Sequence, residues 1–264
     1  MDLQKLMSYT RRAMDDYHMV DEGDVVAVAV SGGKDSMALA LALKGLERFY
    51  PGKFTLRAYT VSIGFPNMDY SPLKTFFAEH EIPYEVIETG IREIVFDERK
   101  EENPCSLCAT LRKGALYDRC VADGVTKVAL GHHREDTVET LLLSLIYEGR
   151  LNTFQPVTKL SRTGLGIIRP LIYVPERDVI GFVNKYDVPV LKNTCPVDGY
   201  TKRQEVEELL KSLNEKDHET TKRMFTAIQR SELEGWAGFT PGSHRIQSGM
   251  RKNLTESDLP DHSR

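Results

Sequence analysis

The sequence has no long hydrophobic run and few cysteines. No stretch of its 264 residues stays apolar over the roughly 20 positions that a membrane-spanning helix needs, which argues against a membrane protein. Residues 1–17 are amphipathic and charged, and they lack the apolar core of a secretory signal. Without such a signal, four cysteines indicate a reducing cytoplasm, where thiols more often bind metals or act in catalysis than form disulfides.

An excess of positive charge is also missing. The formal net charge is -4, so any nucleic-acid binding must be local. Residues 149–203 have the opposite sign, with nine Lys or Arg against four Asp or Glu. A solvated surface would explain this balance, but it also predicts a patch for a phosphate backbone. The candidates for contact with such a backbone are Arg150, Lys159, Arg162 and Arg203.

The stretch that organises the chain is residues 25–43. An unbroken apolar run, 25–30, predicts a strand buried on both faces, and the helix-prone segment 37–43 follows the turn SGGKDS. Gly32 and Gly33 allow backbone N–H groups to converge on a phosphate, the helix start adds a partial positive charge, and Lys34 adds a full one. The first glycine of the GxxxxGK[ST] pattern is absent, which excludes a Walker A loop.

The motif SGGKDS, after a strand and before a helix, resembles the signature of the PP-loop ATP pyrophosphatase family. The resemblance implies cleavage of ATP between the α- and β-phosphates and adenylation of a substrate oxygen. It implies ATP binding by Ser31, Gly32, Gly33, Lys34, Asp35 and Ser36, with Lys34 and Asp35 also acting in catalysis. A structural glycine turn is the alternative, but such a turn needs neither Lys nor Asp.

A second motif, LGHHRED (130–136), ends a later strand and also resembles the PP-loop family. It implies that Gly131 and His132 lie beside the nucleotide. His133 has two open interpretations, a place beside the nucleotide or a capping and packing role. Asp136 is a candidate catalytic residue and Mg²⁺ ligand, because this hard cation prefers carboxylate oxygen.

The order of predicted elements indicates an α/β fold with a doubly wound, mainly parallel sheet and C-terminal helices, as in PP-loop or adenine nucleotide alpha hydrolase-like domains. Loops after the first, second and fourth strands should line the site.

Ser71 is expected to cap a helix. Residues 148–164 are expected to form a polar connection. The expected divisions are an N-terminal helix (1–20), a PP-loop ATPase domain (21–200), C-terminal helices (201–234) and a poorly ordered tail (235–264).

Three cysteines stand in positions that suit a metal group. Cys105 and Cys108 form a CxxC, which fits a redox pair, half a zinc site or part of an iron–sulfur cluster. Cys195 adds a third sulfur, one short of the four ligands of a closed zinc site. Arg112 and Lys113 would raise thiolate character, attract phosphate and stabilise developing charge. Cys120 is expected to pack in the core.

These motifs, the IIRPL–Y–PERD segment (167–178) and residues 224–229 occur in the order found in the tRNA 2-thiocytidine synthetase (TtcA-type) family, which the chain resembles over residues 1–235. The resemblance implies thiolation of cytidine 32 of a tRNA, dependent on ATP and Mg²⁺. It implies a [4Fe-4S] cluster on Cys105, Cys108 and Cys195, a sulfur donor such as a cysteine desulfurase or free sulfide, and a possible homodimer.

Two features depart from the family pattern. The residues after Cys195 are PVDGY, without the second Cys and the Gly-Ser of typical members, and Glu135 stands where the motif has Asp. Two alternatives therefore stay open. One is a related PP-loop enzyme, of the 2-thiouridine or lysidine type, with zinc or redox cysteines. The other is a non-catalytic nucleotide or cluster sensor.

Overall fold

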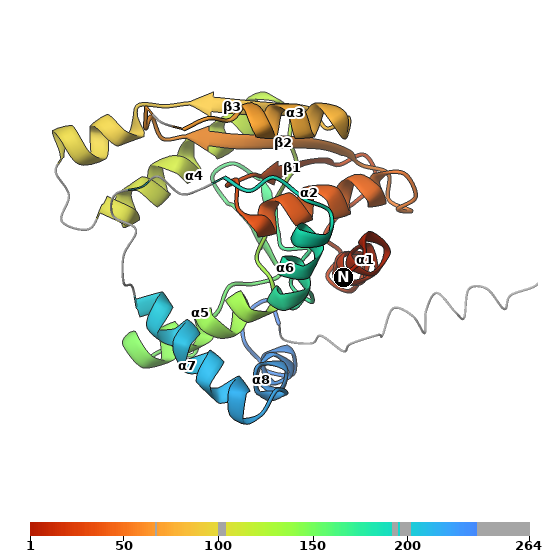
Figure 1. The fold of residues 1–264 in the computed structure, drawn as a ribbon, viewed down its shortest axis with the longest axis vertical. Helices are drawn as coiled ribbons and strands as arrows, with labels where there is room; N and C mark the ends of the chain where they lie inside the picture. The colour runs from red at the N-terminus through yellow and green to blue at the C-terminus, as the bar shows by residue number, and fades with distance from the viewer. Residues whose placement is uncertain (67, 100–103, 192–194, 196–201, 237–264) are drawn as a thin grey trace, which may run out of the picture.

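The computed structural model describes residues 1–66, 68–99, 104–191, 195 and 202–236, and its centre is a six-stranded sheet (Figure 1). The strand order is β3-β2-β1-β4-β6-β5, and only β5 runs antiparallel to its neighbour. The strands are β1 (Val25–Ala29), β2 (Thr55–Ser62), β3 (Tyr84–Glu88), β4 (Lys127–Ala129), β5 (Val157–Lys159) and β6 (Gly166–Ile168). The predicted doubly wound, mainly parallel α/β sheet is confirmed.

Helices cover both faces of the sheet. The elements are α1 (Leu3–Asp16), α2 (Lys34–Glu47), α3 (Ser71–Glu79), η1 (Glu93–Glu98), α4 (Pro104–Ala122), α5 (Arg134–Tyr147), α6 (Glu176–Lys185), α7 (Lys202–Lys216) and α8 (Thr220–Gln229). Helices α1, α2, α3 and α6 supply side chains to one core, whereas η1 and α4 supply the other. None of these helices is both long enough and apolar enough to cross a membrane.

The two cores follow from the alternation of side chains along β1. Val26 and Val28 point into the core that α2 covers, and Ala27 points into the core that α4 covers. Because both faces are buried, the strand reads as a continuous apolar run rather than as an alternating pattern. Cys120 is fully buried in the second core, as the sequence predicts.

The C-terminal helices α7 and α8 pack against α5, so they extend one side of the molecule (Figure 1). Phe225 and Ile228 of α8 are buried in the core that α2 covers. Trp236 follows α8 and is fully buried, with its ring 5.8 Å from the rings of Tyr17 and Phe225. The predicted disordered tail therefore does not begin at Gly235, and the rest of that prediction, 237–264, lies outside the described residues.

Three local predictions differ from the structure. The connection 148–164 contains β5, a three-residue strand too short to show a period. Ser71 is the first residue of α3 rather than its cap, and it donates its backbone N–H to Asp69 at 2.9 Å. The sequence predicts a helix over 136–147 behind the LGHHRED motif, but α5 begins two residues earlier, at Arg134, because His133 serves as its N-cap.

Candidate active site

The loop after β1 is held in shape by its own hydrogen bonds. Gly32 has φ +84°, a conformation that residues with a side chain rarely adopt. The Ser36 hydroxyl donates a hydrogen bond to the Gly33 carbonyl at 2.9 Å. The same hydroxyl oxygen accepts a hydrogen bond from the Ser31 backbone N–H at 3.2 Å. Leu191 donates its backbone N–H to the Gly32 carbonyl at 2.9 Å. The loop therefore has a defined shape without a ligand.

Helix α2 begins directly after this loop and offers unpaired amides. Its N-cap is Gly33, which has no side chain to accept their hydrogen bonds. The first amides of an α-helix have no partner within the helix, and the helix dipole makes this end positive. The start of α2 is therefore suited to bind phosphate oxygens.

The exit of β4 lies against the same helix start. The strand order reverses between β1 and β4, so this is the switch point at which doubly wound sheets bind ligands. A Cβ atom on Gly131 would lie 2.9 Å from the Asp35 carbonyl carbon and 2.9 Å from the Ser36 nitrogen. Only glycine allows this approach of the two backbones.

We expect Gly131→Ala to destabilise the protein by about 1–3 kcal/mol, because the added methyl group must displace backbone at the start of α2. The same displacement should weaken binding at the phosphate loop. Gly114→Ala is the matched control, since its Cβ would meet no atom within 4 Å in the middle of α4. Alanine there should stabilise the helix by about 0.5–1 kcal/mol. Urea unfolding would measure both changes, and equal stability of the two variants would contradict the expectation.

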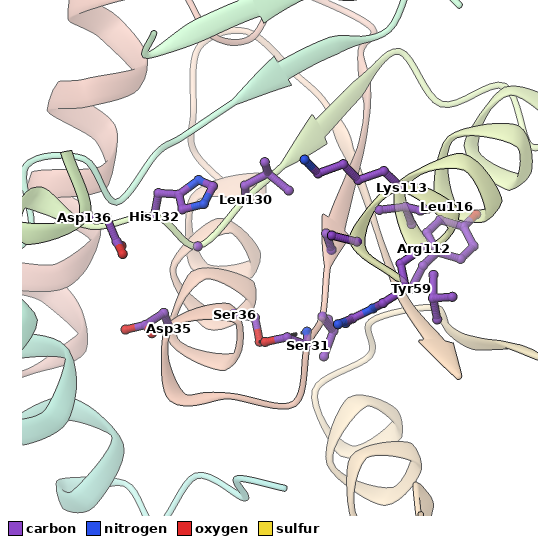
Figure 2. Close-up of a pocket in the computed structure, with 15 residues that line it drawn as sticks. Ser31, Asp35, Ser36, Tyr59, Arg112, Lys113, Leu116, Leu130, His132 and Asp136 are labelled. Atoms are coloured by element: carbon purple, nitrogen blue, oxygen red, sulfur yellow. Dashed lines mark hydrogen bonds between the residues drawn. The ribbon is translucent and has the colours of Figure 1, made fainter. Parts of the chain in front are cut away.

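These elements enclose a cavity of about 350 Å³, within the range of small-ligand sites (Figure 2). Figure 2 shows Ser31 and Ser36 on one side of it and Arg112, Lys113 and Tyr59 on another. The lining residues are Ala29, Val30, Ser31, Asp35, Ser36, Tyr59, Val61, Ala109, Arg112, Lys113, Leu116, Leu130, Gly131, His132 and Asp136. Loops after β1 and β4, together with β2, thus form the site with α4.

Five of the eight predicted nucleotide-binding residues line this cavity, namely Ser31, Asp35, Ser36, Gly131 and His132. Gly32, Gly33 and Lys34 do not, although Gly33 lines the adjoining cavity. Among the described residues, Lys34 lines a second cavity between the starts of α2 and α6 and helix α7. Its ammonium lies 3.0 Å from Asp35 Oδ2 and 3.0 Å from Glu176 Oε1. Burial lowers the pKa of this amine, but the two carboxylates outweigh burial and raise it. Lys34 is therefore a paired cation at the edge of the loop.

His132 lies half-buried in the cavity wall (Figure 2). Its ring stacks on the ring of Phe154, with the two centroids 4.8 Å apart. The Arg169 guanidinium also lies over the Phe154 ring, 4.8 Å from its centroid. Burial lowers the pKa of His132 to about 4, and Arg169 also lowers it, against the charge of Asp136. His132 is thus neutral at physiological pH, and within the described structure its buried Nδ1 has no hydrogen-bond partner.

His133 occupies the capping position that the sequence left as one of two interpretations. Its backbone N–H donates to Asp136 Oδ2 at 2.8 Å, and its Nδ1 lies 3.4 Å from the Asp136 amide. Burial lowers the pKa of His133, but contact with Glu135 and the charges of Asp136 and Asp35 raise it to about 9. At neutral pH the ring is therefore a cation among these carboxylates and has no acceptor for the Asp136 N–H, so the bond from the His133 backbone N–H to Asp136 is the one that holds the helix start.

Asp35 and Asp136 carry the carboxylates nearest the phosphate loop (Figure 2). Asp35 Oδ1 is buried and has no hydrogen-bond partner among the described residues. Both carboxylate oxygens of Asp136 already accept hydrogen bonds. Oδ1 accepts one from Arg203 at 2.9 Å, and Oδ2 accepts one from the His133 backbone N–H. A hard cation would satisfy the orphaned oxygen of Asp35, so the donor chemistry fits Mg²⁺.

Cys105 and Cys108 lie in the first turn of α4, one helical turn before Arg112. Cys105 is exposed, and Cys108 and Cys195 are half-buried. Burial raises the pKa of the Cys108 thiol, Arg112 opposes this, and Cys195 and Cys105 raise it further. Cys195 therefore lies within electrostatic reach of Cys108, although it comes from a segment beyond α6.

In the described ranges, no three His, Cys, Asp or Glu side chains converge as ligands of a single metal ion. A four-iron cluster makes a different demand, because each cysteine binds its own iron and the sulfur atoms stand apart around the cluster. Three cysteines, two from α4 and Cys195 from a later segment, fit that donor set.

The four residues predicted to contact RNA do not form one patch. Arg203 of α7 pairs with Asp136 and with Glu139 at 3.3 Å, near the start of α5. Arg150 follows the other end of α5, about 20 Å away by helix length, and pairs with Glu148. Lys159 ends β5, and Arg162, in the turn to β6, pairs with Asp118. Arg203 is thus an anchor of α7 in this structure.

Several site residues carry no sequence signal of their own. From sequence, Glu176 is recognisable only as a residue at the start of a helix. Tyr59 lies in a predicted strand, Phe154 in the predicted polar connection and Arg169 in an extended segment, and none of these settings marks a site residue. The extended segment IIRP (167–170) contains an unusual feature, an arginine between apolar residues, that could have marked Arg169. Its guanidinium is buried and has no carboxylate partner among the described residues, and burial lowers its pKa to about 10.

Comparison with solved structures supports the fold. The chain matches the U34-tRNA thiolase NcsA from Methanococcus maripaludis, solved with its [4Fe-4S] cluster, with a TM-score of 0.70. The match covers 86% of this chain and 80% of the other, at 22% sequence identity. At this identity the match establishes a shared fold.

Sequence comparisons are closer. A family model described as PP-loop domain matches residues 6–195. A tRNA-cytidine(32) 2-sulfurtransferase from Geobacter metallireducens is 38% identical over 90% of this chain and 91% of its own length. Another from Coxiella burnetii is 34% identical over 85% of this chain and 89% of its own length. With these matches over most of its length, and with the phosphate loop and the β4 exit at one cavity, this chain belongs to the PP-loop domain family and, within it, to the tRNA-cytidine(32) 2-sulfurtransferase family.

Proposed function

We propose that the protein is a tRNA sulfurtransferase, an enzyme that replaces the C2 oxygen of cytidine 32 with sulfur and uses ATP and Mg²⁺ to activate that oxygen. The observation that carries the proposal is the shared cavity. One wall is the phosphate loop and the opposite wall is α4, which bears Cys105 and Cys108. From α4, the cavity is lined by Ala109, Arg112 and Lys113, and Cys108 directly precedes Ala109 on that helix. A site for sulfur chemistry at the start of α4 would thus adjoin the site for an activating nucleotide.

The phosphate loop is suited to the first step. The α2 amides and the Ser31 and Ser36 hydroxyls would bind ATP phosphates, and Asp35 would hold Mg²⁺ with Asp136 beside it. The cytosine O2 attacks the α-phosphorus, a P–O bond forms, and pyrophosphate leaves. Arg112 would stabilise the charge on the phosphates, because it lines both this cavity and its neighbour.

The second step exchanges oxygen for sulfur. A donor at the oxidation level of sulfide attacks C2, the C2–O bond breaks, and AMP leaves with the oxygen, so no net oxidation or reduction occurs. Cys105, Cys108 and Cys195 would hold a [4Fe-4S] cluster. Such a cluster, held by three thiolates, supplies an iron with an open position for a sulfur ligand. Arg112 and Lys113 would stabilise AMP as the leaving group.

His132 is suited to contact the substrate rather than to carry charge. A neutral imidazole has one donor and one acceptor, and the stack on Phe154 fixes the plane of the ring. Its place in the cavity wall would let it hydrogen-bond to the nucleotide or to the target base. A flipped base is the form in which RNA-modifying enzymes reach an atom inside a loop.

The test is thiolation of a defined tRNA by the anaerobically purified protein. With ATP, Mg²⁺ and sulfide, we expect 2-thiocytidine in the digested tRNA and one AMP released for each modified base. A cytidine-to-uridine change at position 32 of the tRNA should remove the product. Thiolation of a uridine instead, or AMP release coupled to lysine attachment, would contradict the proposed substrate and favour a related PP-loop enzyme.

A further inference from the structure

The position of Lys34 raises the question of what this lysine does. It is the first residue of α2, yet it lines the second cavity, together with Asp35 and Glu176, and not the nucleotide cavity. Asp35 and Glu176 each lie 3.0 Å from it, and the lysine side chain is only 29% exposed. An ammonium held by two carboxylates carries little free charge toward a triphosphate. Moving it into the cavity would break both contacts.

Glu176 is held in place independently of Lys34. It is the first residue of α6, and its backbone N–H donates to Glu135 Oε2 at 2.8 Å. The backbone N–H of Arg134 donates to the Val174 carbonyl at 3.1 Å, just before α6. The start of α6 is thus fixed to the start of α5 at two points, so Glu176 presents its carboxylate from a fixed position.

The group around this contact is mostly acidic. His133 Nε2 lies 3.9 Å from Glu176 and 3.9 Å from Asp35, and Glu135 lies next to His133. The Lys34 ammonium bridges the carboxylate of Asp35, next to it in α2, and the carboxylate of Glu176 in α6. The contact therefore connects the first turn of α2 with α6, and through Glu135 with α5.

We propose that Glu176 is a positioning residue of the phosphate loop: by holding the Lys34 ammonium it fixes the first turn of α2, whose amides bind the ATP phosphates. Lys34 supports ATP binding through Glu176 and not by contact with the triphosphate. The inference rests on the proposed use of ATP. It assigns a role to a helix that contributes no residue to the described lining of the nucleotide cavity.

A double-mutant cycle tests the proposal. Lys34→Met, Glu176→Gln and the double variant are compared with the wild type, with Mg²⁺–ATP affinity measured by calorimetry and KM for ATP and kcat measured by tRNA thiolation. We expect each single change to weaken ATP binding about 5–10-fold and the double variant to be no weaker than the worse single one, since both remove the same contact. At saturating ATP, kcat should stay within about twofold, because the reacting groups are unchanged.

Two results would overturn the proposal. If Lys34 contacts the triphosphate and Glu176 merely competes for it, Glu176→Gln will tighten ATP binding. If the two residues act separately, their effects will multiply in the double variant. A wild type that binds no ATP would instead overturn the proposed function, and this inference with it.

Matched variants separate positioning from folding. Asp178→Asn removes a carboxylate from the same first turn of α6, away from Lys34, and should leave ATP affinity unchanged. Lys34→Arg keeps a cation that can pair with Glu176 and should restore most of the affinity. If Glu176→Gln does not fold, as judged by circular dichroism, Lys34→Met and Lys34→Arg still decide the question. Equal loss of ATP affinity in both would contradict a role that depends on the ion pair.

Discussion

Cys195→Ser is expected to remove the iron from the protein and to abolish tRNA thiolation, while Mg²⁺–ATP binding stays within about twofold. Serine has nearly the size of cysteine, but its hydroxyl is a poor ligand for a cluster held by thiolates. The phosphate loop does not depend on this side chain, since its shape comes from Ser31, Gly33 and Ser36. Anaerobic purification followed by absorption spectroscopy and by iron, sulfide and zinc analysis measures the change. The wild type should contain about four irons per chain.

Cys120 provides the matched control for this experiment. It is the fourth cysteine and is fully buried among Leu116, Val125 and other apolar side chains. Burial raises the pKa of its thiol to about 12, so it is a poor source of thiolate. Cys120→Ala should keep iron and activity and cost about 1 kcal/mol of stability. Stoichiometric zinc in the wild type, or iron retained by Cys195→Ser, would contradict the proposed ligand set.

Arg112→Met is expected to lower kcat for thiolation by about 10²–10³, the usual effect of removing one group that stabilises transition-state charge. Arg112 extends from α4 toward the phosphate loop (Figure 2). It lines both adjoining cavities, and no ion pair holds it among the described residues. Its charge is thus available to the phosphates in both proposed steps. Steady-state kinetics at saturating ATP and tRNA would measure the loss.

Arg119 lies two helical turns further along the same helix and is the matched control. It pairs with Glu85 at 2.8 Å and Asp123 at 3.2 Å, outside the lining of the nucleotide cavity. Arg119→Met should leave kcat unchanged. Arg112→Lys should recover part of the rate, because a lysine keeps the charge but not the planar, bidentate geometry. Similar kcat values for Arg112→Met and Arg119→Met would show that Arg112 does not stabilise the reaction.

The sheet and most helices could be predicted because their signals are local. The apolar run 25–30 and the alternation of strands and helices each need only a short stretch of chain. The strand β5 could not be predicted, since three residues show no period and its pairing with β6 decides its structure. Trp236 likewise reads as part of a polar tail, and only its contacts with Tyr17, Phe225 and the Phe154 carbonyl explain its burial.

The candidate site divides in the same way. The residues of SGGKDS and LGHHRED that face the nucleotide cavity follow the carboxyl ends of β1 and β4, which adjacent parallel strands bring together. The RNA-contact prediction used charge balance over 149–203, and charge alone does not say which cations already have partners. Arg203 shows the consequence, since it is bound to Asp136 and Glu139.

The sequence by itself determined the elements whose geometry depends on neighbouring residues: the buried strand, the glycine turn with Gly32 at positive φ, the helix that starts behind it, and two cysteines one turn apart on a helix. Tertiary structure decided which remote groups meet them. Glu176 reaches Lys34, Phe154 stacks on His132, and Cys195 comes within electrostatic reach of Cys108 only because distant segments pack together. Such contacts leave no local pattern, because their partners are chosen by the packing of the whole chain and not by spacing along it.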